Sequence, residues 1–290
     1  MPEPTQMPQL TLMTVHAHPD DESISTGGVL ARYSAEGVKT VLVTCTDGSC
    51  GDAPGGAKPG DTGHVPDDVV ELRQAELEES CKVLGVTHLE SLGYRDSGMM
   101  GWPQNDDPGS FWTTPVDEAA SRLAELFEKH RPHVVVTYNE NGFYGHPDHI
   151  QAHRITVAAI EKTGIPAKLY FTAVPKSWFA ELGQRLQELG VEFPSVDNPE
   201  DAAVPAEEGA SGPEEWGTPD EEITTVIDVS VAVDQKFDSL TAHASQSDNI
   251  FFLQMGREAF GEMMTREAFV RVIDSTGAPT PEDDLFAGLR

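Results

Sequence analysis

Short apolar runs alternate with amphipathic stretches along the first 175 residues of the chain. Most of the apolar runs are rich in β-branched residues, and all are five to eight residues long, which is typical of strands buried in a parallel sheet. They occupy residues 10–17, 40–46, 88–92, 133–138 and 167–174. The stretches between them carry apolar residues at helical spacing and mostly end at a glycine. They predict helices at 23–37, 67–85, 116–129 and 148–164.

The order of these elements predicts the fold class. Strands that alternate with helices at this spacing form βαβ units, in which each crossover helix covers a face of the sheet. We therefore expect an α/β protein with a Rossmann-like, mostly parallel sheet and helices on both faces.

Beyond residue 175 the alternation becomes less regular. Residues 175–190 and 234–244 suit helices, 225–231 suits a strand, and 251–272 suits a packed, partly helical region. Residues 194–221 are crowded with proline, glycine and acidic residues, which favours an exposed loop. We expect a single domain over 1–290, in which 1–175 is the core that carries the functional site and 176–290 elaborates its sheet.

Composition narrows the classes of partner. The chain has 290 residues with 49 acidic against 19 basic side chains, a formal net charge of -30, which argues against binding to nucleic acid or to an anionic membrane. The odd number of cysteines, 3, favours a reduced, cytoplasmic setting. The first ten residues show no signal peptide, and no apolar run is long enough to span a membrane. A small-molecule substrate is expected, and a homo-oligomer is left open.

Polar side chains gather directly after the predicted strands. In open α/β sheets, ligands bind beyond the carboxyl ends of the strands. The first strand is followed by H-A-H-P-D-D-E at 16–22, and the fourth by N-E-N-G-F-Y-G-H-P-D-H at 139–149. The second and third are followed by T-D-G-S at 46–49 and Y-R-D-S at 94–97. We expect the functional site at the edge where these four strand ends meet.

Two of these clusters repeat one pattern, H-P-D-D at 18–21 and H-P-D-H at 146–149. In each, proline favours a tight turn, and the fourth residue lies three positions beyond a histidine, so one turn can aim both side chains inward. Two such turns could supply histidine and carboxylate ligands to a divalent cation. Catalytic zinc typically keeps three such ligands and one position for water, while iron, cobalt or manganese accept the same atoms.

Each motif also has a plainer interpretation as the start of a helix, because aspartate there accepts hydrogen bonds from free N–H groups. That interpretation is weaker for the two motifs together, since both follow predicted parallel strands. Gly27 and Gly28 follow the first strand, but G-x-G-x-x-G is absent, so a dinucleotide-binding loop is not supported.

At this level of detail the chain resembles a known family. H-P-D-D-E-S-x-x-x-G-G at 18–28, together with Y-x-x-N-G-x-Y-G-H-P-D-H at 138–149, resembles the LmbE-like, or PIG-L, family of metal-dependent N-deacetylases. Y-R-D-S-G-M at 94–99 and A-H-A-S-Q at 242–246 are similar to its actinobacterial mycothiol branch. That branch contains the N-acetylglucosaminyl-inositol deacetylase and the mycothiol S-conjugate amidase.

The resemblance implies separate roles for individual residues of the two motifs. His18, Asp21 and His149 are implied as the ligands of the metal, expected to be Zn²⁺ with Fe²⁺ as an alternative. Asp20 is then the general base. His16 is expected to be a structural residue at the end of the first strand.

The resemblance also implies roles around the reacting amide. His146, oriented by Asp148, is expected to stabilise the oxyanion as an imidazolium, and Tyr144 to hydrogen-bond the same oxygen. Arg73 and Asp96 match positions that bind the hydroxyls of the sugar or inositol. For Asp148 the alternative is capping of the helix at 149–163, and for Arg73 and Asp96 it is surface ion pairs.

The expected function is that of a zinc-dependent amidohydrolase that removes an acyl group, expected to be acetyl, from a glucosamine-containing substrate. Metal coordination can lower the pKa of water from about 15.7 towards ~7, and a neighbouring carboxylate can then remove its proton. Either Asp20 or His146 could protonate the departing amine. The alternatives are a mycothiol S-conjugate amidase, a natural-product sugar deacetylase and a non-catalytic Rossmann-like module with a structural metal. The substrate is left open by two departures from the relatives. Ser49 stands where relatives commonly carry a glutamate, and the loop at 50–66 lacks their substrate-facing pattern.

Overall fold

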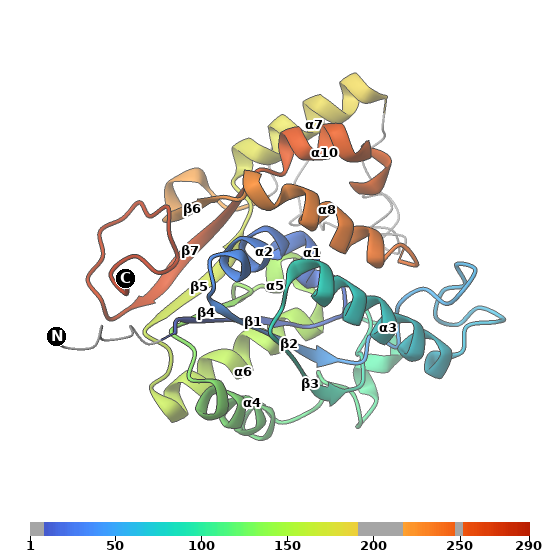
Figure 1. Ribbon diagram of the computed structural model, residues 1–290. Helices are drawn as coiled ribbons and strands as arrows, with labels where there is room; N and C mark the ends of the chain where they lie inside the picture. Colours follow the sequence, from blue (N-terminus) through green and yellow to red (C-terminus); the bar gives the residue numbers. More distant parts are fainter. Residues whose placement is uncertain (1–8, 191–216, 247–251) are drawn as a thin grey trace.

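The computed structural model describes residues 9–190, 217–246 and 252–290. In these ranges the strands form one seven-stranded sheet in the order β3-β2-β1-β4-β5-β7-β6 (Figure 1). The strands are β1 (Thr11–His16), β2 (Lys39–Thr46), β3 (His88–Tyr94), β4 (Val134–Thr137), β5 (Lys168–Ala173), β6 (Thr225–Asp228) and β7 (Arg266–Asp274).

The five strands from the first part of the chain pair in parallel, as the strand–helix alternation predicts. β1, which is buried along its whole length, lies between β2 and β4 at the centre of this parallel portion. The strands from the C-terminal segment extend the same sheet, with β7 antiparallel to β5 and β6 antiparallel to β7. The expected α/β class and mostly parallel sheet are therefore confirmed.

Helices cover both faces of the sheet (Figure 1). They are α1 (Asp21–Ser25), α2 (Gly27–Ala35), α3 (Pro66–Leu84), α4 (Val116–His130), α5 (Gly142–Gly145), α6 (Pro147–Thr163), α7 (Lys176–Leu189), α8 (Val233–Ala242) and α10 (Gly256–Met263). On one face, α4 and α6 pack on alternate residues of β1 and β2, and on the other α2 packs on β1 and β4. α8 lies outside this second layer, against α3 and α2.

The structure corrects one expectation about local structure and adds an element that was not predicted. The helix predicted at 23–37 is two helices, α1 and α2, separated at Thr26, whose hydroxyl donates to the Glu22 carbonyl. The region at 251–272 is partly helical, as expected, since it contains α10, but it also contains most of strand β7. β7 is a strand because its backbone pairs on both sides, with β5 and β6, a long-range effect that local periodicity cannot report.

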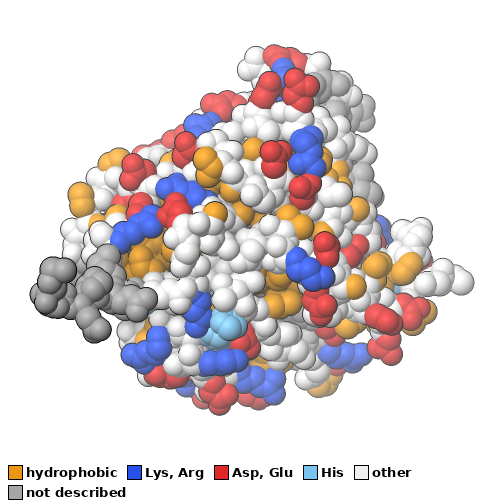
Figure 2. Space-filling view, in the orientation of Figure 1, with side chains coloured by type: hydrophobic (Ala, Val, Ile, Leu, Met, Phe, Trp, Pro, Cys, Tyr) orange, Lys and Arg blue, Asp and Glu red, His pale blue; other side chains and the backbone are white. Residues whose placement is uncertain are grey.

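Part of the chain is left untested by the structure. Most of the acidic loop predicted at 194–221 lies outside the described residues, and the single-domain organisation stays a prediction for the same reason. Within the described ranges, no helix combines the length and the apolar character needed to cross a bilayer. Figure 2 shows acidic and basic side chains interspersed over the visible face.

Candidate metal centre

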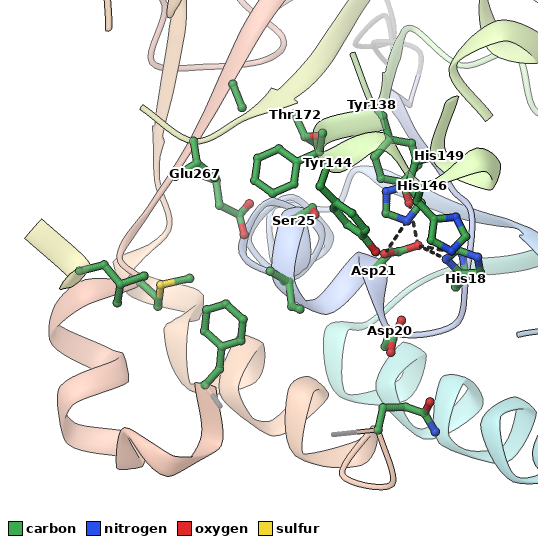
Figure 3. Close-up of a pocket in the computed structure, with 18 of the residues that line it drawn as sticks. His18, Asp20, Asp21, Ser25, Tyr138, Tyr144, His146, His149, Thr172 and Glu267 are labelled. Carbon is green, nitrogen blue, oxygen red and sulfur yellow. Dashed lines mark hydrogen bonds and ion pairs between the residues drawn. The ribbon is translucent and has the colours of Figure 1, made fainter. Parts of the chain in front are cut away.

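A cavity of about 540 Å³ opens at the carboxyl ends of the parallel strands. Nearly every predicted site residue lines it, and Figure 3 shows the side chains from the two H-P-D turns pointing toward one another across its floor. The lining members of the predicted set are His18, Asp20, Asp21, Arg73, Asp96, Tyr144, His146 and His149. Asp148 is fully buried beside the cavity and does not line it.

The two H-P-D turns bring three histidines and a carboxylate together. Ring nitrogens of His18, His146 and His149 lie within 4.8 Å of one another, a spacing that could hold a metal ion. The Asp21 carboxylate bridges two of these rings, with Oδ2 at 3.4 Å from His18 Nδ1 and Oδ1 at 3.4 Å from His149 Nε2 (Figure 3). β1 ends just before the first turn, and α6 begins inside the second, so strand and helix ends fix both turns.

His149 is oriented as a metal ligand requires. Its Nδ1 donates to the carbonyl oxygen of Gly142 at 3.1 Å, so Nε2 is the nitrogen left for coordination. That Nε2 atom is buried and makes no hydrogen bond to any described residue, although it lies 3.4 Å from Asp21 Oδ1. Because buried polar atoms are normally hydrogen-bonded, an imidazole nitrogen that faces a carboxylate and a second histidine without such a bond fits a metal ligand.

Asp148 contacts a different histidine from the one expected. Its Oδ2 lies 3.2 Å from His18 Nε2, and its carboxylate also accepts hydrogen bonds from the Ser97 backbone N at 2.8 Å and the Ser97 hydroxyl at 2.5 Å. The expectation that the carboxylate orients His146 is wrong, and so is the alternative that it caps the helix. The reason is that the His146 ring itself caps α6, accepting the Asp148 backbone N–H at Nδ1, while the Asp148 side chain contacts Ser97, in the loop after β3, and His18.

This capping bond also fixes the tautomer of His146. A ring whose Nδ1 accepts an N–H is neutral and keeps its proton on Nε2. Burial holds the pKa of His146 well below its usual range, and the neighbouring charges of His18 and His149 lower that pKa further. The expected imidazolium is therefore replaced by a neutral ring that can donate from Nε2.

Asp20 occupies a strained position between the cavity and α3. Its φ of 111° lies in the left-handed region that aspartate adopts only at a cost. Arg73 Nη2 lies 3.1 Å from Asp20 Oδ2, and the guanidinium also donates to the carbonyl oxygens of Pro19 and Gly48. Burial raises the pKa of Asp20 to about 6, outweighing the opposite effect of Arg73. Such a carboxylate can accept and release a proton near neutral pH.

The alternative of surface ion pairs is wrong for Arg73 and for Asp96. Arg73 is 4% exposed and Asp96 is 5% exposed. Asp96 accepts the backbone N–H groups of Cys50 and Gly98, and its Oδ1 lies 3.7 Å from His18 Nε2. Burial acts to raise the pKa of Asp96, but the facing His18 overcomes burial and holds that pKa well below its usual range. Asp96 therefore presents an ionised carboxylate to the cavity.

Tyr138 is a site residue that the sequence did not single out. Its hydroxyl donates to Asp21 Oδ2 at 2.7 Å and accepts the Ala17 backbone N–H at 2.9 Å, while its ring stacks on His149 at 4.2 Å between centroids. Its position at the head of Y-x-x-N-G was the available signal. Tyr144 lies over the same histidine, 4.9 Å from the His149 ring, on the cavity side (Figure 3).

His16, expected to be structural, lies outside the cavity. It is fully buried, and its Nε2 lies 2.8 Å from the hydroxyl of Thr26. Burial lowers the pKa of His16 to about 4, so the ring is neutral at the pH of the cell.

Comparisons with known proteins agree with this site. Residues 13–160 match the model of the PIG-L family, described as GlcNAc-PI de-N-acetylase. The chain is 43% identical over 297 residues to the 1D-myo-inositol 2-acetamido-2-deoxy-alpha-D-glucopyranoside deacetylase of Acidothermus cellulolyticus, covering 96% of this chain and 95% of that one. The sequence resemblance noted above is thereby confirmed.

Solved structures support the fold alone. The N,N'-diacetylchitobiose deacetylase of Pyrococcus horikoshii matches with a TM-score of 0.55 at 19% identity, covering 90% of this chain and 83% of that one. A 4-carboxy-2-hydroxymuconate hydratase of Pseudomonas putida matches with a TM-score of 0.57 at 18% identity, covering 93% and 99%. Since the fold carries both a deacetylase and a hydratase, it does not decide the chemistry. The sequence match does decide the family: this chain belongs to the PIG-L family of de-N-acetylases.

Proposed function

We propose that this chain is a metal-dependent N-deacetylase that hydrolyses the acetamido group of an N-acetylglucosaminyl-inositol. The observation that carries the proposal is the pair of adjacent carboxylates in one cavity: Asp21 faces two histidines, and Asp20, with a pKa of about 6, faces an arginine. Amide hydrolysis needs both a ligand and a base at this place. The relatives' names support the choice of substrate.

His18 Nδ1, Asp21 and His149 Nε2 would hold the metal, which we propose to be Zn²⁺. Three nitrogen and oxygen ligands suit catalytic zinc, and Fe²⁺ accepts the same donors. When bound, the metal supplies Lewis-acid chemistry, polarising the amide carbonyl and lowering the pKa of water. Asp148 contacts Nε2 of His18, the ring nitrogen that is not assigned to the metal, and Tyr138 donates a hydrogen bond to Asp21. These two contacts orient both proposed ligands.

The remaining side chains transfer protons and stabilise the charge that develops on the carbonyl oxygen. Asp20 accepts the proton of the attacking water, since its raised pKa makes it a stronger base than an ordinary carboxylate. The Nε2–H of His146 and the hydroxyl of Tyr144 donate to the carbonyl oxygen as it becomes negative. Because His146 is neutral and its Nδ1 is occupied, the proton taken by Asp20 is the one that passes to the departing amine.

Asp96 is the group we assign to substrate hydroxyls, because its ionised carboxylate lines the cavity next to the histidines. Arg73 serves the substrate indirectly, because its guanidinium is committed to Asp20 and to the carbonyl oxygens of Pro19 and Gly48. A cytoplasmic location is part of the proposal and rests on the free thiols of Cys45, Cys50 and Cys81.

Release of free amine by the metal-loaded protein tests the substrate. We expect the highest kcat/KM with N-acetylglucosaminyl-inositol, compared with a mycothiol S-conjugate and an N-acetylated natural-product sugar. A faster reaction with the S-conjugate would establish an amidase instead. No amine from any of the three, with metal shown to be bound, would refute the deacetylase assignment and leave the non-catalytic metal-binding module.

Two substitutions test the roles of the adjacent carboxylates. Asp20→Ala is expected to retain bound metal and lose hydrolysis, whereas Asp21→Ala is expected to lose the metal. Metal content after dialysis, measured by elemental analysis, separates them. Loss of metal from Asp20→Ala would overturn the assignment of Asp20 as the base.

A further inference from the structure

A buried polar cluster lies behind Asp20, on the side away from the cavity. Its centre is the carboxylate of Glu22, which is 0% exposed and lines no part of the cavity. Glu22 Oε1 accepts hydrogen bonds from the hydroxyls of Ser23 at 3.0 Å and Ser80 at 2.5 Å, and from His243 Nε2 at 2.8 Å. Glu22 Oε2 accepts the backbone N–H of Asp20 at 3.0 Å.

This last bond acts on the residue whose backbone is strained. An aspartate in the left-handed region is strained and persists only when its surroundings fix it. Different partners fix the backbone and the carboxylate of Asp20. Its backbone N–H is held by Glu22, and its carboxylate is held by Arg73, which also holds the preceding carbonyl of Pro19.

Glu22 is in turn fixed from a distant part of the chain. His243, which directly follows α8, is 221 residues away in sequence and is itself 0% exposed. The segment that carries it is anchored independently, because Ser245 donates its hydroxyl to Glu76 of α3 at 2.8 Å. A buried carboxylate requires such a partner, since an uncompensated charge in the interior is strongly destabilising.

We propose that His243, acting through Glu22, is a positioning residue for the base Asp20. The proposal rests on the proposed function for the identity of the base. His243 fixes the Glu22 carboxylate, the carboxylate fixes the Asp20 backbone N–H, and the left-handed backbone then presents the Asp20 side chain to the cavity beside Arg73. The C-terminal segment thus sets the geometry of a base that belongs to the N-terminal turn.

A purely structural role for His243 predicts a different result from a positioning role. If the pair served only to dock the segment after α8, any variant that weakens docking would act alike, through stability. If the pair positions Asp20, the loss appears in kcat, with KM and metal content unchanged, because a displacement of about 1 Å can cost about 10²-fold in rate.

The test compares three variants of the full-length, metal-loaded protein. His243→Leu removes the donor to Glu22, His243→Gln keeps an N–H donor, and Ser245→Ala weakens docking of the same segment without touching Glu22. We expect His243→Leu to lower kcat for deacetylation by about 10- to 100-fold with KM within about twofold and metal retained. We expect His243→Gln to recover most of this loss, and Ser245→Ala to keep the wild-type kcat.

Equal kcat values for His243→Leu and Ser245→Ala would overturn the proposal, as would a failure of His243→Gln to exceed His243→Leu. If His243→Leu does not fold, the same comparison is made with Glu22→Gln, which should lose kcat and keep its metal. A crystal structure of whichever variant folds decides the positional claim even if the wild type deacetylates none of the substrates. Asp20 must leave the left-handed conformation or separate from Arg73, and an unchanged Asp20 refutes the proposal independently of the function.

Discussion

Replacing Tyr138 by phenylalanine isolates what one hydroxyl does for Asp21, a proposed metal ligand. The substitution leaves the ring that stacks on His149 and removes only the oxygen that joins Asp21 Oδ2 to the Ala17 backbone N–H. Asp21 then loses one of two donors to Oδ2 and keeps the other, the His18 backbone N–H at 2.8 Å. We expect the affinity for the metal to fall by about 10- to 100-fold, the usual effect of removing a partner that orients a ligand.

The same change should lower the stability of the metal-free protein. A hydrogen bond to a charged group contributes about 1.5–3 kcal/mol, and a buried N–H left without a partner, here that of Ala17, costs about 1–3 kcal/mol. We therefore expect the free energy of unfolding to fall by about 3 kcal/mol. Tyr170→Phe is the matched control, because Tyr170 is also fully buried and donates to a carboxylate, Glu282, at 2.8 Å, but lies outside the cavity.

Two measurements separate the effects. Guanidinium unfolding in excess chelator gives the stability of each variant without the contribution of bound metal. Competition with a chromophoric chelator gives the dissociation constant of the metal. We expect both variants to be destabilised and only Tyr138→Phe to bind metal more weakly. If Tyr138→Phe binds metal within twofold of the wild type while both are destabilised alike, the orienting role of Tyr138 is refuted.

Three further predictions concern two contacts at the site and one ion pair between β5 and the C-terminal segment. Asp148→Asn should weaken metal binding by about 10-fold or more, because the charge behind His18 is lost, with chelator competition as the measurement. The acid limb of kcat/KM should lie at or below pH 6, since Asp20 must be deprotonated to act as a base and a bound cation lowers its pKa further; a limb above pH 7 contradicts this assignment. Lys168→Met should lower the free energy of unfolding by about 1.5–3 kcal/mol, measured in guanidinium, because the buried Glu282 loses its hydrogen bond from Lys168 at 2.5 Å and keeps Arg271 at 2.8 Å as its remaining cationic partner.

The sequence predicted those features that depend on neighbouring residues. Apolar runs and helical spacing located the parallel strands and most helices, because burial on both faces leaves a periodic trace. The two H-P-D motifs predicted the pairing of distant turns, since parallel strand ends meet at one edge. β7 was missed because its pairing with β5 and β6 is decided by tertiary contacts rather than by its own periodicity.

The sequence could not predict which partners the side chains of the site contact. Asp148 follows His146 so closely that an interaction between the two side chains was the natural expectation, yet Ser97, from the loop after β3, draws the carboxylate toward His18. His243 lies in the A-H-A-S-Q motif, but nothing in the sequence indicates that it meets Glu22, 221 residues earlier. Both contacts form only once the loops converge on the strand ends.

The adjacent aspartates show why such contacts decide the chemistry. Burial alone would raise the pKa of both carboxyls. For Asp21, the facing His149 and His18 overcome burial and hold the pKa well below its usual range, so it stays ionised as a ligand must. For Asp20, Arg73 does not overcome burial, and the pKa stays raised at about 6. Two neighbouring acids with pKa values driven apart are the arrangement that separates a ligand from a base. The two side chains have these different neighbours because Asp20 is held beside Arg73, with its left-handed backbone bonded to Glu22, so we expect the Glu22 and Arg73 contacts to be as necessary to the proposed division of roles as the carboxylates themselves.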